Sequence, residues 1–151
     1  MITRRLIAVP VDAVEVRSEF QRFLDQAKSN GWTELKVRFG FAWETPADRE
    51  SGLEEILTPV ELAERVHSAE SDGRGKVGED DLYLTPIANG VEHLFCHDAD
   101  IHLTGPGNSV YLESEATRYA SLGWVVYESI KSGEETNFGK VHRFKPQEGS
   151  C

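Results

Sequence analysis

Residues 91–104, VEHLFCHDADIHLT, concentrate side chains that can bind metal ions or transfer protons. The stretch holds three of the five histidines and one of the two cysteines. Cys96, Asp98, Asp100 and His102 alternate along it, so in an extended strand they would share one face with neighbours roughly 6.6 Å apart. With a further ligand from elsewhere, two or three of them could hold zinc or a similar divalent ion. No other cofactor is expected.

The same stretch has a second interpretation, in which residues 97–100 form a turn between two strands, because aspartate favours turns. His93 and His97 have the spacing of a helical metal pair, but on a strand they stand about 13 Å apart, so no shared metal is expected. Cys96 and His97 are adjacent, and adjacent strand residues point to opposite faces. We therefore expect Cys96 to be a buried structural cysteine.

Residues 73–78, GRGKVG, match the G-x-G-x-x-G pattern of dinucleotide-binding loops. Such a loop must follow a strand and open a helix, so that backbone amides meet the pyrophosphate. Here it follows a predicted helix and leads into Glu79, Asp80 and Asp81, whose carboxylates repel phosphate. We interpret it as a connecting loop. No serine lies in a G-x-S-x-G motif, and the sequence favours a protein that is not an enzyme.

The net charge of −10 is concentrated in the middle of the chain. Residues 41–100 carry four Lys/Arg against fifteen Asp/Glu, for −11, whereas residues 1–40 carry +2 and residues 101–151 carry −1. An acidic field disfavours nucleic acid and anionic lipid and favours cationic partners, although a solvated face that aids solubility is the simpler explanation. The acidic residues are Glu44, Asp48, Glu50, Glu54, Glu55, Glu61, Glu64, Glu70, Asp72, Glu79, Asp80, Asp81, Glu92, Asp98 and Asp100.

Small acidic domains without catalytic motifs are often inhibitors of basic proteins, such as immunity proteins that block nuclease toxins. We therefore expect a non-enzymatic protein that binds a basic protein partner, and no nucleic acid or membrane. Two aromatic residues near the acidic region serve either as interface anchors or as core. The residues predicted to contact the partner are Glu79, Asp80, Asp81, Trp43, Tyr83, Asp98 and Asp100. The alternatives are a small metal-binding protein or hydrolase with a site at residues 96–104, and a structural domain of a larger assembly.

Three helices are expected to position these residues. The first covers residues 16–28, where apolar side chains fall at steps of three and four. The second begins after Thr58, because Thr58 and Glu61 form a capping box around Pro59 at the first helical position. A third opens at Ser114.

Six or seven strands are expected beside the helices. Residues 32–43 alternate between apolar and polar side chains, as in a half-buried strand. Residues 44–57 are expected to be a polar connection. Asn89 and Gly90 favour a two-residue hairpin turn, which would place Leu84 opposite Phe95.

At 151 residues, the chain has the length of one domain. We predict a single α+β domain over residues 1–151, with a mostly antiparallel sheet of six to seven strands, about three helices packed on one face and a loose tail from residue 145. Cys96 and Cys151 make no disulfide framework, and no stretch approaches the roughly 20 apolar residues of a membrane helix, so a cytoplasmic protein is expected.

Overall fold

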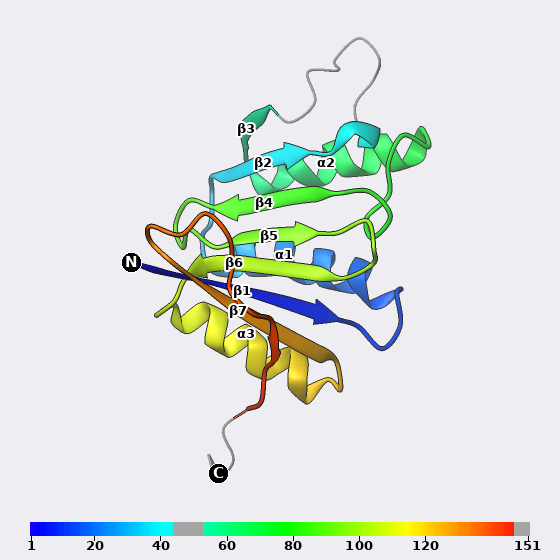
Figure 1. The fold of residues 1–151 in the computed structure, drawn as a ribbon. Coiled ribbons are helices and arrows are strands. Elements are labelled where there is room, and N and C mark those ends of the chain that lie inside the picture. Colours follow the sequence, from blue (N-terminus) through cyan, green and yellow to red (C-terminus); the bar gives the residue numbers. More distant parts are fainter. Residues whose placement is uncertain (44–52, 147–151) are drawn as a thin grey trace.

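Three helices cover one face of a sheet in the computed structural model, which describes residues 1–43 and 53–146 (Figure 1). Over these residues the sheet has eight strands. The strands are β1 (Ile2–Val9), β2 (Leu35–Phe39), β3 (Glu54–Leu57), β4 (Leu82–Pro86), β5 (Glu92–Phe95), β6 (Ile101–Pro106), β7 (Val125–Ser132) and β8 (His142–Arg143). The helices are α1 (Glu15–Ser29), α2 (Pro59–Ser71) and α3 (Val110–Ser121), and a 3₁₀ turn covers Phe41–Trp43.

The sheet has the strand order β3-β2-β4-β5-β6-β1-β7-β8, and all of its pairs are antiparallel. The N-terminal strand β1 lies between β6 and β7, with Leu6 opposite Leu103 on one side and Glu128 on the other. The first segment of the chain is therefore held by strands that follow it by about a hundred residues.

Alternating side chains divide the sheet into a buried face and an open face. On the buried face Leu84 and Leu103 are inaccessible to solvent, and Phe20 of α1 meets Phe95 edge to face with ring centroids 5.6 Å apart. The open face presents partly buried side chains such as His102. The chain after β7 returns over part of this face (Figure 1). In this segment, Phe138 lies under the guanidinium of Arg5 at 3.8 Å.

The predicted fold class is confirmed, with three helices on one face of an antiparallel sheet. The strand count is eight rather than six or seven, because β3 lies in the segment expected to be a polar connection. The capping box of α2 is present: Thr58 Oγ1 accepts from the Glu61 amide, and Glu61 Oε1 accepts from the Thr58 amide, both at 3.2 Å. Helix α3 begins at Val110 rather than Ser114, because the side chain of Ser109 caps it.

The turn between β4 and β5 is longer than predicted. Leu84 lies opposite His93 instead of Phe95. The Gly90 amide donates to the Pro86 carbonyl at 2.9 Å, so the turn takes up more than two residues. Because the pairing shifts by two positions, each side chain keeps its predicted face and changes only its cross-strand neighbour.

Within the described ranges, no helix has both the length and the apolar character needed to cross a membrane.

Candidate functional site

Two acidic segments that are distant in sequence meet at one end of the sheet. Strand β4 starts and β5 stops at this end, and Asp81 accepts hydrogen bonds from the His97 amide and from His97 Nδ1, both at 2.9 Å. Figure 1 shows this end on the right, where β4 begins and β5 turns into β6. We call this set the acidic end; its members are Glu79, Asp80, Asp81, Asp98 and Asp100.

The members of the acidic end differ in how freely they can meet a partner. Asp80 accepts a hydrogen bond from the Lys76 amide at 3.0 Å, and Asp81 is fixed by His97. In contrast, the side chains of Glu79 and Asp98 are 66% and 72% exposed. Those two carboxylates are the most accessible of the set.

Other acidic residues of the middle region are spread over the molecule: Glu70 lines the same hollow as Glu79 and Asp80, whereas Glu55 lies on β3 at the edge of the sheet. Glu55 is bridged by Arg65 at 3.1 Å, and Glu70 by Arg17. The acidic region of the sequence is therefore not one continuous surface over the described residues. Three acidic residues of the middle region, Glu44, Asp48 and Glu50, lie outside the residues that the structure describes.

Three of the four predicted metal ligands converge on the open face. Residues 97–99 form a turn, in which Ala99 has a positive φ of 59° and the Cys96 amide donates to the Asp100 carbonyl at 3.0 Å. The ligand atoms of Cys96, Asp100 and His102 nevertheless lie within 4.8 Å of one another, because the turn folds Asp100 back beside Cys96. Asp98 is exposed in the turn and is not part of this cluster.

A second cluster shares Cys96 and joins it to Asp81 and His97, again with ligand atoms within 4.8 Å. The expectation that Cys96 and His97 point apart is wrong, because β5 ends at Phe95: Cys96 Sγ lies 3.7 Å from His97 Nδ1. Sequence reasoning did not identify Asp81 and His97 as members of such a cluster. Asp81 could have been identified from the register of β4 and β5. Leu82 lies opposite Phe95, so the same register places Asp81 beside Cys96.

The charge states of these groups argue against a cysteine nucleophile. Burial, assisted by the neighbouring Asp100 and Asp81 carboxylates, raises the pKa of the Cys96 thiol to about 11. A thiol with that pKa is protonated at neutral pH and is a poor nucleophile. The Asp81 carboxylate raises the pKa of His97. Burial opposes ionisation of Asp100, but the hydrogen bond from His102 Nε2 at 3.0 Å, together with the charge of His102 and the contacts with Cys96 and His97, outweighs it, so the pKa of Asp100 is lowered.

The two predicted aromatic anchors have different environments. Trp43 is 3% exposed, with its ring centroid 6.0 Å from that of Phe39, so it belongs to the core. Tyr83 is partly buried on the open face, with the guanidinium of Arg38 over its ring at 3.9 Å. Only Tyr83 is placed to touch a partner.

The glycine-rich residues 73–78 follow α2 and form a loop, as predicted, and one of the glycines has a packing role. A Cβ on Gly75 would lie 2.6 Å from the Trp43 ring. Gly75→Ala is expected to lower the free energy of unfolding by about 1–3 kcal/mol, because the ring would have to leave its place in the core. Urea denaturation measures this change, with the exposed Lys76→Ala as the control. Equal stability of Gly75→Ala and the wild type would contradict the close packing.

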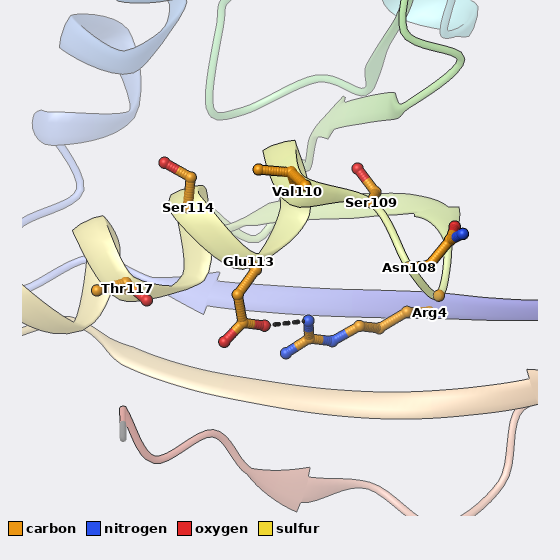
Figure 2. Close-up of a pocket in the computed structure, with 8 residues that line it drawn as sticks. Arg4, Asn108, Ser109, Val110, Glu113, Ser114 and Thr117 are labelled. Atoms are coloured by element: carbon orange, nitrogen blue, oxygen red, sulfur yellow. Dashed lines mark hydrogen bonds and ion pairs between the residues drawn. The ribbon is translucent and has the colours of Figure 1, made fainter. Parts of the chain in front are cut away.

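A surface hollow of about 610 Å³ lies at the start of α3 (Figure 2). Arg4 enters it from β1 and Glu113 from α3. The guanidinium of Arg4 is held by Glu113 at 2.5 Å and by Glu128 at 2.6 Å, so its charge is already neutralised. The charged groups in this hollow therefore pair with one another, and the ion pairs join α3 to the sheet.

A buried polar network that the sequence analysis did not identify joins α1 to α3. Glu115 accepts from Arg22 at 3.0 Å and from Arg118 at 2.9 Å, and Arg118 also donates to Glu19 at 2.6 Å. Glu19 falls three residues after Val16, on the apolar face of α1, and this is the sequence signal that could have revealed it. The role of this network is structural.

Comparison with known proteins does not extend this description: no protein-family model, curated protein or solved structure shows a significant match to the chain.

Proposed function

We propose that the chain is a non-enzymatic binding protein of the immunity or inhibitor type, which engages a basic protein through the acidic end. The observation that carries the proposal is the meeting of residues 79–81 with the turn after β5, because it collects five carboxylates at one end of the sheet. Opposite charges on two proteins speed their association and favour one orientation of the complex.

The surroundings of Asp81 support this role. Its hydrogen bonds with His97 hold the two acidic segments together, so the charges are displayed on a fixed framework. Tyr83 follows Asp81 by two positions and lies on the same open face. A partner that contacts the carboxylates would therefore also reach an aromatic side chain, a type that often supplies interface energy.

The chemistry of Cys96 supports a binding role over catalysis. Its thiol is protonated at neutral pH, and its neighbour His97 uses the same Nδ1 atom that contacts Asp81. In a catalytic triad, one ring nitrogen of the histidine contacts the nucleophile and the other contacts the carboxylate. The setting that we propose is the cytoplasm, where free Cys96 would stay reduced.

The test is affinity capture from the source cells with tagged protein at graded salt, followed by mass spectrometry. We expect one basic protein to be retained at low salt and released as salt rises. The variant Glu79→Lys with Asp98→Lys should associate with it about tenfold more slowly or worse, because two accessible carboxylates become cations.

The matched control is Glu134→Lys with Glu135→Lys, which makes the same change in net charge in the turn after β7, away from the acidic end. The control should retain the partner. If both double variants retain it equally, or both lose it equally, the acidic end is not the binding surface.

A further inference from the structure

We propose that Cys96, Asp100 and His102 form a binding site for one zinc-like divalent cation on the open face, with Asp81 or His97 as the fourth ligand. Nothing in this proposal depends on the identity of a protein partner. The accessible carboxylates tested above, Glu79 and Asp98, are not among the ligands, so the two ideas can fail separately.

The donor atoms are close to the separations that a tetrahedral ion requires. Zinc bonds of about 2.3 Å to sulfur and about 2.0–2.1 Å to nitrogen place neighbouring donors about 3.3–3.6 Å apart. Cys96 Sγ lies 3.7 Å from His97 Nδ1, and Asp100 Oδ1 lies 3.0 Å from His102 Nε2. Each cluster fits within 4.8 Å and Cys96 belongs to both, so Asp81 and His97 lie next to Cys96 and either could complete the site by a side-chain movement.

The backbone holds the ligands in place without a metal. The Cys96 amide donates to the Asp100 carbonyl at 3.0 Å, and the Ala99 amide donates to the Cys96 carbonyl at 3.1 Å. The His97 amide donates to Asp81 at 2.9 Å, which ties β4 to the same turn. His102 Nε2 donates to Asp100 Oδ1 at 3.0 Å, so these two side chains lie on the same face. Fixed ligands of this kind reduce the cost of ordering the site when the ion binds.

The ligand set selects the class of ion. A thiolate and imidazoles favour zinc, cobalt or copper over magnesium and calcium, which prefer oxygen ligands alone. On binding, the cation would displace the thiol proton of Cys96 to solvent, and neutral His102 would shift its ring proton from Nε2 to Nδ1. Nε2 and the Asp100 carboxylate would then each bind the metal in place of the hydrogen bond between them. The remaining carboxylates of the acidic end would add a favourable field for a cation.

Cobalt(II) titration of the folded protein tests the site, because a cobalt–thiolate bond produces a charge-transfer absorption. The titration uses the Cys151→Ser variant, so that Cys96 is its only thiol. We expect one equivalent of cobalt to bind with thiolate absorption, and one equivalent of zinc to abolish that absorption. Absence of the absorption in the folded protein would overturn the proposal.

Ligand variants in the same background identify the site. Cys96→Ser should remove the absorption, and His102→Asn should weaken cobalt binding by about tenfold or more. His67→Asn, which changes an exposed histidine of α2, should bind as the parent does. Far-UV circular dichroism checks that each variant is folded, and the parent titration does not depend on their folding. Binding by His102→Asn as tight as by the His67→Asn control would contradict the assignment.

Discussion

Replacing Arg118 with alanine is expected to lower the free energy of unfolding by about 3–5 kcal/mol, because it strands buried carboxylates. Arg118 donates to Glu19 at 2.6 Å and to Glu115 at 2.9 Å, and the side chains of those glutamates are only 10% and 4% exposed. Arg22 would remain to pair with Glu115, but Glu19 would lose the ion-pair partner that the structure gives it. The loss is large because one guanidinium serves both carboxylates.

Urea denaturation at neutral pH measures this effect through the midpoint, provided that the slope of the transition is unchanged. The matched control is Arg17→Ala, which removes an arginine of α1 that is 51% exposed and paired with Glu70. Solvent screens the half-exposed arginine, and Glu70 keeps the hydrogen bond from the Val77 amide, so the loss of this pair is expected to cost about 1 kcal/mol or less. If Arg118→Ala costs no more than Arg17→Ala, the carboxylates are not dependent on Arg118 and the network is not a stabilising unit.

Acidification from pH 7 to pH 4 is expected to remove up to about 3 kcal/mol of stability through His93 alone. Burial lowers the pKa of His93 from 6.5 to about 4. Its Nδ1 donates to the Val91 carbonyl at 2.9 Å, and Nε2 contacts the Tyr111 hydroxyl at 2.8 Å. The charge of Glu115 raises the pKa of His93 and the charge of Arg22 lowers it, but each effect is smaller than that of burial.

The sign follows from which state holds the proton. Below about pH 6.5 the unfolded chain binds a proton on His93, whereas the folded protein does not until about pH 4. The contribution of neutral His93 is therefore complete above pH 6.5 and declines as the pH falls toward 4. Carboxyl groups also titrate in this pH range. The quantity to measure is therefore the difference in free energy of unfolding between the wild type and a His93 variant at each pH.

The variant for this measurement is His93→Gln, which keeps a polar side chain beside Tyr111 but does not titrate. We expect it to be less stable than the wild type at pH 7 and to lose less stability on acidification, so that urea midpoints of the two proteins converge toward pH 4. His67→Gln, at an exposed position, should follow the wild-type profile. Parallel profiles for wild type and His93→Gln would show that His93 does not couple folding to pH.

Local features of the chain were predictable because their causes lie within a few residues. The capping box at Thr58 places the start of α2, since its two hydrogen bonds link positions three apart. Alternation in residues 32–43 predicts the buried face of β2, although the strand itself is Leu35–Phe39. The aspartates of residues 97–100 favour the turn that the structure has.

The candidate site was predictable in part. Cys96, Asp100 and His102 were found from their alternation, and their convergence survives the turn because Cys96 and Asp100 pair across it. Asp98 does not join this cluster, because alternation along an extended strand does not hold in a turn. Asp81 and His97 could not be found without the pairing of β4 with β5, which depends on how many residues the intervening turn takes up.

By itself, the sequence determined the α+β class, the faces of the strands and the excess of negative charge, because periodicity and composition are properties of each segment alone. Only the tertiary structure decided that β1 lies between β6 and β7, that the carboxylates of residues 79–81 meet the turn after β5, and that Arg118 serves both Glu19 and Glu115. The physical reason is that a side chain's face follows from its local period, whereas its cross-strand or interhelical neighbour depends on register and packing between distant segments.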